Sequence, residues 1–266
     1  MGSVHGIPPE GMISAPSFRL EDVSRQWGRR IAVRNLSLDI NPGEIVALVG
    51  PSGGGKSTVI RMLAGVLRPT AGSVWVSNRD IATFSPRELR KHRARCRMVE
   101  QDHLLVPQLS VHQNIVAGQA SGWPWYKVVA AALWPIGRDH VRTLLESLGI
   151  AGHQWNLASE LSGGQKQRVT IARALVSEPS ALLADEPTAS LDPATARSVT
   201  EILLTEVRRR GVTSVVCTHW LDLVLDRVDR VIGLREGCLV LDAKSSEVTQ
   251  TALDYLYEGS HERVQS

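Results

Sequence analysis

The sequence predicts an α/β protein in which a mostly helical lobe is inserted into a sheet-based core. Three apolar runs, at 45–49, 181–184 and 214–217, are continuous rather than alternating, which is typical of parallel strands buried on both faces. The second and third runs each follow a segment with a helical pattern. The stretch from about 101 to 168 is also mostly helical in pattern and separates the first run from the other two. At 266 residues, the chain is long enough for one large domain of this kind.

The first elements are half-exposed strands. Apolar and polar residues alternate over 18–23 and 36–40, which indicates strands with one face on the core. The sequence Asn-Pro-Gly at 41–43 predicts a turn before the buried strand at 45–49. A second turn at 69–72 predicts a further strand at 73–76.

The sequence predicts two helices in this part of the chain. A helix is expected from Lys56 to about Ala64. The segment Ser85-Pro86-Arg87-Glu88 combines an N-cap serine, a proline at the first helical position and a glutamate three residues after the cap. This combination predicts a helix that begins at Pro86.

Composition excludes several classes of protein. The chain carries 30 basic and 27 acidic residues, and the net charge of +3 is too small to indicate a nucleic-acid partner. Its three cysteines, Cys96, Cys217 and Cys238, are scattered, which suggests neither a disulfide framework nor a metal cluster. A reducing, cytoplasmic setting is the simplest interpretation.

No apolar stretch reaches the roughly 18 residues of a membrane span. The nearest candidate, 123–135, is rich in tryptophan and is interrupted by Lys127 and two prolines, so we expect a partly buried or partner-facing helix there. Residues 1–15 lack the apolar core of a signal peptide and are expected to form a flexible leader, and 259–266 a flexible tail.

A glycine-rich segment directly after the strand at 45–49 predicts a phosphate-binding loop. It fits the pattern glycine, four residues, glycine-lysine-serine. Glycines let the backbone curl so that its amides point at phosphate oxygens, and the helix that opens near Lys56 adds its positive N-terminal end. Lys56 is expected to reach the terminal phosphates and Ser57 to ligate magnesium. The alternative is a strand-to-helix turn without a ligand, which the strand-then-helix context disfavours. The predicted ATP-binding residues of this segment are Gly50, Pro51, Ser52, Gly53, Gly54, Gly55, Lys56, Ser57 and Thr58.

Acidic residues follow the buried strand at 181–184. Asp185 is expected to hold magnesium and Glu186 to polarise the attacking water. By themselves the two acids could mark a solvated end of a strand, and the phosphate loop favours the catalytic interpretation. His219 follows the strand at 214–217, where an imidazole could contact the γ-phosphate and hold Glu186 and water in line. A histidine after a strand is usually a loop residue, and its place in the order of motifs favours a role here.

Gln101 follows a strand-like segment at 97–99, where its side-chain carbonyl could join the magnesium shell. It also stands at the junction with the helical lobe. If it ligates only when ATP is bound, rotation of the lobe becomes coupled to nucleotide state.

The sequence Leu161-Ser162-Gly163-Gly164-Gln165 predicts the start of another helix. Ser162 has the spacing of an N-cap and Gln165 stands three residues later. The amides and the helix dipole would form an anion site that has no phosphate of its own to bind.

Together these motifs resemble the ATP-binding cassette of ABC transporters, over about 18–257. The segment Leu161–Gln165, followed by 166–175, is the most specific part. The resemblance implies a P-loop NTPase fold with a RecA-like core, an antiparallel β subdomain and an inserted α-helical subdomain at about 101–168. It implies one ATP-binding domain over 16–258, with ATP and Mg²⁺ as cofactors.

The resemblance also implies individual roles. Gln101 would be the Q-loop, Asp192 part of the D-loop, and His219 the switch histidine. Trp27 stands where the family usually carries an aromatic residue that stacks on adenine, although it could be a surface tryptophan near a turn. Departures from the family pattern are Glu100, where many relatives have an aromatic residue, and Gly54, where serine or alanine is commoner; neither removes a catalytic group. The signature residues that would contact the ATP of a partner subunit are Ser162, Gly163, Gly164 and Gln165, so the working unit would be a dimer.

The segments 101–118 and 229–257 look similar to the ATPase subunit of phosphonate importers, as does the insert around 133–135. This similarity implies partner permease subunits in the membrane, a periplasmic solute-binding protein that acts indirectly, and a peripheral position on the cytoplasmic face of the membrane. Two alternatives remain open. One is an accessory cassette of a carbon-phosphorus lyase complex, and the other is the ATPase of a lipoprotein-release or peptide-export system.

Overall fold

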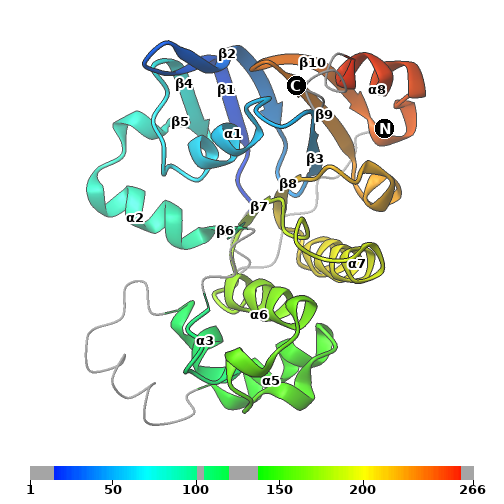
Figure 1. Ribbon diagram of the computed structural model, residues 1–266. Coiled ribbons are helices and arrows are strands. Elements are labelled where there is room, and N and C mark those ends of the chain that lie inside the picture. Colours follow the sequence, from blue (N-terminus) through cyan, green and yellow to red (C-terminus); the bar gives the residue numbers. More distant parts are fainter. Residues whose placement is uncertain (1–14, 101–104, 120–136, 259–266) are drawn as a thin grey trace, which may run out of the picture.

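The computed structural model describes residues 15–100, 105–119 and 137–258. Figure 1 shows two sheets in the upper part of the molecule and a group of helices below them, with β6 and β7 between the two parts. The fold is mixed α/β, as the continuous and alternating apolar patterns predicted.

The larger sheet has six strands in the order β10-β9-β3-β8-β7-β6. Every residue of β3, β7 and β8 is buried, which explains why their sequences are continuous apolar runs. β3 pairs in parallel with β8 and β9, and β7 with β6 and β8, so the predicted parallel strands are confirmed. The strands are β3 (Ile45–Val49), β6 (Cys96–Glu100), β7 (Ala181–Asp185), β8 (Thr213–Cys217), β9 (Arg230–Arg235) and β10 (Cys238–Lys244).

The smaller sheet is antiparallel, in the order β2-β1-β4-β5. The expected strands at 18–23, 36–40 and 73–76 all lie in it, and each is longer than predicted. The alternation follows from burial: Phe18, Leu20 and Val23 face a core that also includes Val46 and Leu48 of the larger sheet. The strands are β1 (Phe18–Trp27), β2 (Arg30–Ile40), β4 (Ala71–Val76) and β5 (Arg79–Asp80).

Side-chain caps begin three of the helices in the sheet region, α2, α7 and α8. Ser85 and Glu88 form the predicted capping box at the start of α2, and hydrogen bonds from Ser85, with Arg79 beside it, lower the pKa of Glu88 to about 2. Asp192 accepts a hydrogen bond from the Thr195 amide and caps α7. The helices of this part are α1 (Lys56–Leu63), α2 (Pro86–Arg95), α7 (Pro193–Arg210) and α8 (Gln250–Tyr257). Short 3₁₀ turns in the chain are Ile81–Thr83, Ala151–His153, Ala158–Glu160, Leu221–Leu223, Leu225–Arg227 and Ser245–Glu247.

The helical lobe contains α3 (Val111–Ala117), α5 (Arg138–Ser147) and α6 (Gly163–Leu175). Its apolar side chains form one continuous core with one face of the six-stranded sheet, while the other face packs on the antiparallel sheet. α6 runs past residue 168, so this helix belongs to the lobe at its start and to the core at its end. The expected domain limits remain predictions.

Some expectations lie outside the described residues: the leader before residue 15, Gln101, the helix at 123–135 and the tail from 259. The three cysteines are free, and burial raises the pKa of Cys96 to about 12. Within the described ranges, no helix is both long enough and apolar enough to span a bilayer.

Candidate nucleotide-binding site

The predicted phosphate loop joins the carboxyl end of β3 to the start of α1, between β2 and β9. Glycine is required at two of its positions. A Cβ on Gly50, where φ is 138°, would lie 2.0 Å from the Leu234 carbonyl oxygen. A Cβ on Gly55, where φ is 103°, would lie 2.5 Å from the Ala32 carbonyl oxygen. Since Gly55 has no side chain to cap α1, no side chain competes with a ligand for the amides of its first turn.

Lys56 points back into this loop. Its side chain is only 4% exposed, and Nζ donates hydrogen bonds to the carbonyl oxygens of Gly50 at 2.8 Å and Pro51 at 3.1 Å. Nζ also lies 3.8 Å from Oε1 of Glu186. The ammonium group is therefore held inside the loop, where phosphates would bind.

Ser57 and Asp185 meet across the end of β7. The Ser57 hydroxyl lies 2.9 Å from Oδ1 of Asp185, and Asp185 is buried. Hydroxyl and carboxylate oxygens are suitable magnesium ligands, so the donor set fits the expected ion. The third expected ligand, Gln101, lies outside the described residues, but the preceding Glu100 is the register partner of Asp185 on the neighbouring strand.

Glu186 and His219 come from the ends of adjacent parallel strands. Nε2 of His219 lies 2.6 Å from Oε1 of Glu186, and β7 pairs with β8 so that Asp185 stands opposite Cys217. The structure thus brings both predicted catalytic residues to the phosphate loop. Glu186 has a positive φ of 50°, which is unfavourable for a residue with a side chain.

The signature segment begins α6 as predicted. The Ser162 hydroxyl accepts a hydrogen bond from the Gln165 amide at 3.3 Å, and the Gln165 side chain accepts one from the Ser162 amide at 2.9 Å. Both residues are exposed or partly exposed, as an anion site open to a partner would require.

Sequence reasoning placed Leu191 with Asp192 in the D-loop but missed Thr195, and both residues pack against the signature glycines. A Cβ on Gly164 would lie 2.4 Å from Cγ2 of Thr195, and a Cβ on Gly163 would lie 3.3 Å from Cδ2 of Leu191. The signature glycines therefore pack on the residues that flank Asp192. No spacing in the sequence could have indicated these contacts, because they join α6 to a segment beyond the next strand.

Trp27 is the last residue of β1 and is 53% exposed. The guanidinium carbon of Arg25 lies 4.0 Å from the centroid of the ring. A large exposed aromatic ring at this position is compatible with the expected adenine contact, which remains a prediction.

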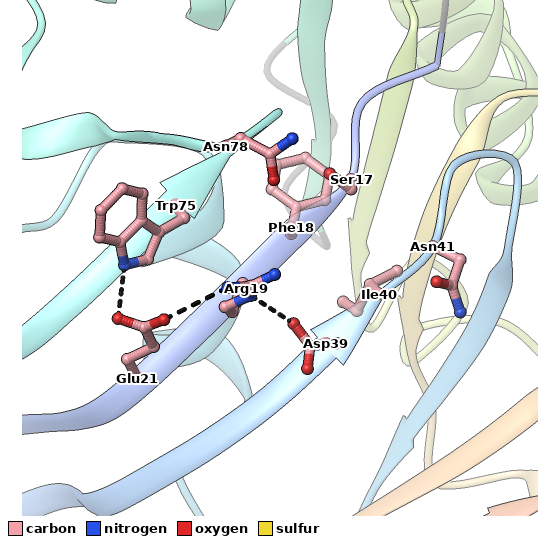
Figure 2. A pocket seen from close by; sticks show the side chains of 9 residues that line it. All are labelled: Ser17, Phe18, Arg19, Glu21, Asp39, Ile40, Asn41, Trp75 and Asn78. Carbon is pink, nitrogen blue, oxygen red and sulfur yellow. Dashed lines mark hydrogen bonds and ion pairs between the residues drawn. The ribbon is translucent and has the colours of Figure 1, made fainter.

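Another pocket, of about 470 Å³, lies at the opposite end of β3. It reaches Asn41, ahead of β3, whereas the phosphate loop leaves the carboxyl end of that strand. Figure 2 shows Arg19 between Glu21 and Asp39, and Trp75 directed toward Glu21. None of the residues that line this pocket is a predicted site residue, so the pocket is separate from the predicted site.

Comparison with known proteins, like the geometry of the loop at 50–58, indicates a nucleotide-binding protein. The sequence pattern of the family described as ABC transporter matches residues 33–189. A phosphonates import ATP-binding protein, PhnC, from Wolinella succinogenes is 36% identical over 241 residues, 90% of this chain and 88% of that protein. A PhnC from Anaeromyxobacter dehalogenans is 42% identical over 243 residues; these are 91% of this chain but 48% of that protein, so the chain spans about half of its length.

Solved structures of ATP-binding cassettes have the same fold. CbiO1 from Clostridium perfringens, part of the ABC transporter complex cbiONQ, has a TM-score of 0.75 and 29% identity, covering 90% of this chain and 93% of that chain. The bacterial ABC transporter cassette MJ0796, solved as a dimer, has a TM-score of 0.72 and 29% identity, covering 86% of this chain and 98% of that chain. The match in sequence pattern, the cassette fold and the loop that holds Lys56 lead to one conclusion: this chain belongs to the ATP-binding cassette family of ABC transporters.

Proposed function

We propose that this chain is the ATP-hydrolysing subunit of an ABC importer for phosphonates or related oxyanions. The observation that best supports ATPase activity is that the side chains of Lys56, Glu186 and His219 lie together at the phosphate loop. The names of the PhnC relatives support the solute class. No described residue bears on the solute itself, since the cassette binds nucleotide and not cargo.

In the proposed reaction, water attacks the γ-phosphorus of ATP, the bond to the bridging oxygen breaks, and ADP and phosphate leave. Lys56 and the amides of 50–58 hold the phosphates. Ser57 and Asp185, together with Gln101, would hold magnesium, which neutralises phosphate charge when bound.

Two residues would then act on the water. The Glu186 carboxylate accepts a hydrogen bond from the attacking water and polarises it. His219 would hold that carboxylate in line through the 2.6 Å contact and would face the γ-phosphate of a bound nucleotide. Binding, orientation and electrostatics account for the reaction without a covalent intermediate on the protein.

A second copy would complete each site. Ser162, Gly163, Gly164 and Gln165 of one copy would contact the ATP held by the partner, with Asp192 beside them. The exposed cap of α6 and the dimeric form of the related cassette MJ0796 support this arrangement. Permease subunits, a solute-binding protein and a peripheral position on the cytoplasmic face follow from the proposed importer role.

The proposal can be tested by co-purification of the chain with candidate permease subunits and reconstitution of the complex in lipid vesicles. The ATPase rate is then measured with empty and with phosphonate-loaded binding protein. We expect stimulation by the loaded form and none in a complex that carries Glu186→Gln. A rate that does not respond to loaded binding protein would contradict import and leave the ATPase assignment standing. Recovery of carbon-phosphorus lyase subunits in place of a permease would favour the accessory-cassette alternative.

A further inference from the structure

The first residues of β2 lie against the phosphate loop. The Ala32 carbonyl oxygen lies 2.5 Å from the position that a Cβ on Gly55 would occupy. The Arg34 amide donates to the carbonyl oxygen of Gly237 at 2.8 Å, and the Gly237 amide donates to that of Gly54 at 3.2 Å. The start of this strand is thus held in a defined position beside the loop.

Arg30, the first residue of β2, extends over the loop itself. Its Nη2 lies 3.3 Å from the position that a Cβ on Gly53 would occupy. On the other side, Arg30 is the register partner of Trp27, so both side chains stand on the same face of the hairpin. Arg30 is therefore placed between the expected adenine platform and the expected phosphate cradle.

The charge of Arg30 has no counterpart within the described parts of the chain, where no ion pair or hydrogen bond of its side chain is found. Arg19 and Arg79, on the same sheet, each have a carboxylate partner. An exposed arginine held against a phosphate loop without an acid beside it leaves positive potential at that point. A guanidinium group also matches the geometry of phosphate oxygens.

We propose that Arg30 is a nucleotide-binding residue that contacts the phosphate chain of bound ATP. This inference rests on the proposed function, because it requires the nucleotide to occupy the loop at 50–58. It predicts that Arg30 discriminates nucleoside polyphosphates from nucleosides, while Trp27 binds the base of both.

The test compares Arg30→Ala with Arg29→Ala in the full chain. Arg29 carries the same charge one residue earlier, in the turn between β1 and β2. Affinities for ATP, ADP and adenosine are measured by calorimetry at two salt concentrations. We expect Arg30→Ala to lose about tenfold in ATP and ADP affinity and none in adenosine affinity, with a weaker salt dependence than the wild type. Arg30→Lys should recover part of the loss.

Equal ATP affinities of Arg30→Ala and the wild type would overturn the inference, and so would a loss of the same size for adenosine. Lys56→Ala separates a failure of the proposed function from a failure of the proposed Arg30 contact. If that variant keeps full ATP affinity, the loop is not the nucleotide site and the proposed function fails. If Lys56→Ala loses ATP while Arg30→Ala does not, only the role of Arg30 fails.

Discussion

Oε1 of Glu186 lies 2.6 Å from Nε2 of His219, although 33 residues separate them in the chain. The contact exists because β7 and β8 are parallel neighbours whose carboxyl ends meet at the same edge of the sheet. The same Glu186 oxygen is 3.8 Å from Nζ of Lys56. One carboxylate thus links the proposed water-polarising, positioning and phosphate-binding groups.

Replacement of Glu186 by glutamine should keep ATP binding and lower the hydrolysis rate by about 10² to 10⁴. The amide keeps the size of the side chain but lacks the negative charge with which the carboxylate polarises the water. Phosphate release and nucleotide affinity are measured separately, and size-exclusion chromatography with ATP should show more dimer. Hydrolysis at the wild-type rate would refute the role of Glu186.

The backbone conformation of Glu186 predicts that some substitutions which remove its activity raise the stability of the fold. Its φ of 50° costs a residue with a side chain about 1 kcal/mol, which glycine avoids and asparagine reduces. Glu186→Gly and Glu186→Asn should therefore melt at a higher temperature than Glu186→Gln, while all three lose hydrolysis. A melting temperature of Glu186→Gly at or below that of the glutamine variant would argue against strain at this residue.

Ser162→Ala should abolish hydrolysis and leave the ATP affinity of the monomer unchanged, since the proposed contact is made with the partner's nucleotide. The substitution also removes a helix cap, at a cost of about 1 kcal/mol. Ser110→Ala is the matched control, because Ser110 and Gln113 form the same capping box at the start of α3. We expect similar melting temperatures for the two variants and hydrolysis only in the control. A large loss of monomer affinity in Ser162→Ala would contradict the contact in trans.

The close packing of Gly164 against Thr195 can be tested by rescue. A Cβ at 164 would lie 2.4 Å from Cγ2 of Thr195, so Gly164→Ala should displace the signature from the D-loop and lower ATPase activity. Thr195→Ser removes that methyl group and should restore much of the activity of Gly164→Ala. An unrestored double variant would mean that the loss has another cause.

Stability should fall as the pH decreases below about 6.5, partly because of His92. Burial lowers the pKa of His92 from its ordinary value of 6.5, and the ring nitrogen Nε2 donates to the Leu63 carbonyl oxygen at 2.9 Å. The unfolded chain therefore takes up a proton at a higher pH than the folded chain. The contribution of His92 to the free energy of unfolding is therefore intact above the pKa that His92 has in the unfolded chain. It is lost as the pH falls toward the lower pKa of the folded chain.

Urea unfolding of the wild type and of His92→Gln at pH 8 and pH 5.5 measures this effect. Glutamine can keep the hydrogen bond to Leu63 and does not titrate, so its loss of unfolding free energy on acidification should be smaller. Equal losses in both proteins would exclude His92 as a contributor.

Local sequence patterns were sufficient for much of the fold. The continuous runs at 45–49, 181–184 and 214–217 are the buried strands of the larger sheet, and alternation at 18–23 marks a strand of the smaller one. The caps at Ser85 and Ser162 were also predictable, because donor and acceptor are three residues apart in the chain. Chain order and motif type predicted Lys56, Asp185, Glu186 and His219 as site residues; the structure brings these side chains together, and their roles stay predictions.

Only the tertiary structure decided which of these groups touch. The Ser57–Asp185 contact, the Gly164–Thr195 packing and the position of Arg30 over Gly53 all join segments from different strands or helices. Their distances depend on sheet order and register, and on how β2 and α7 pack against their neighbours. No local pattern encodes those relations, because burial of the shared apolar core, rather than any spacing along the chain, brings these segments together.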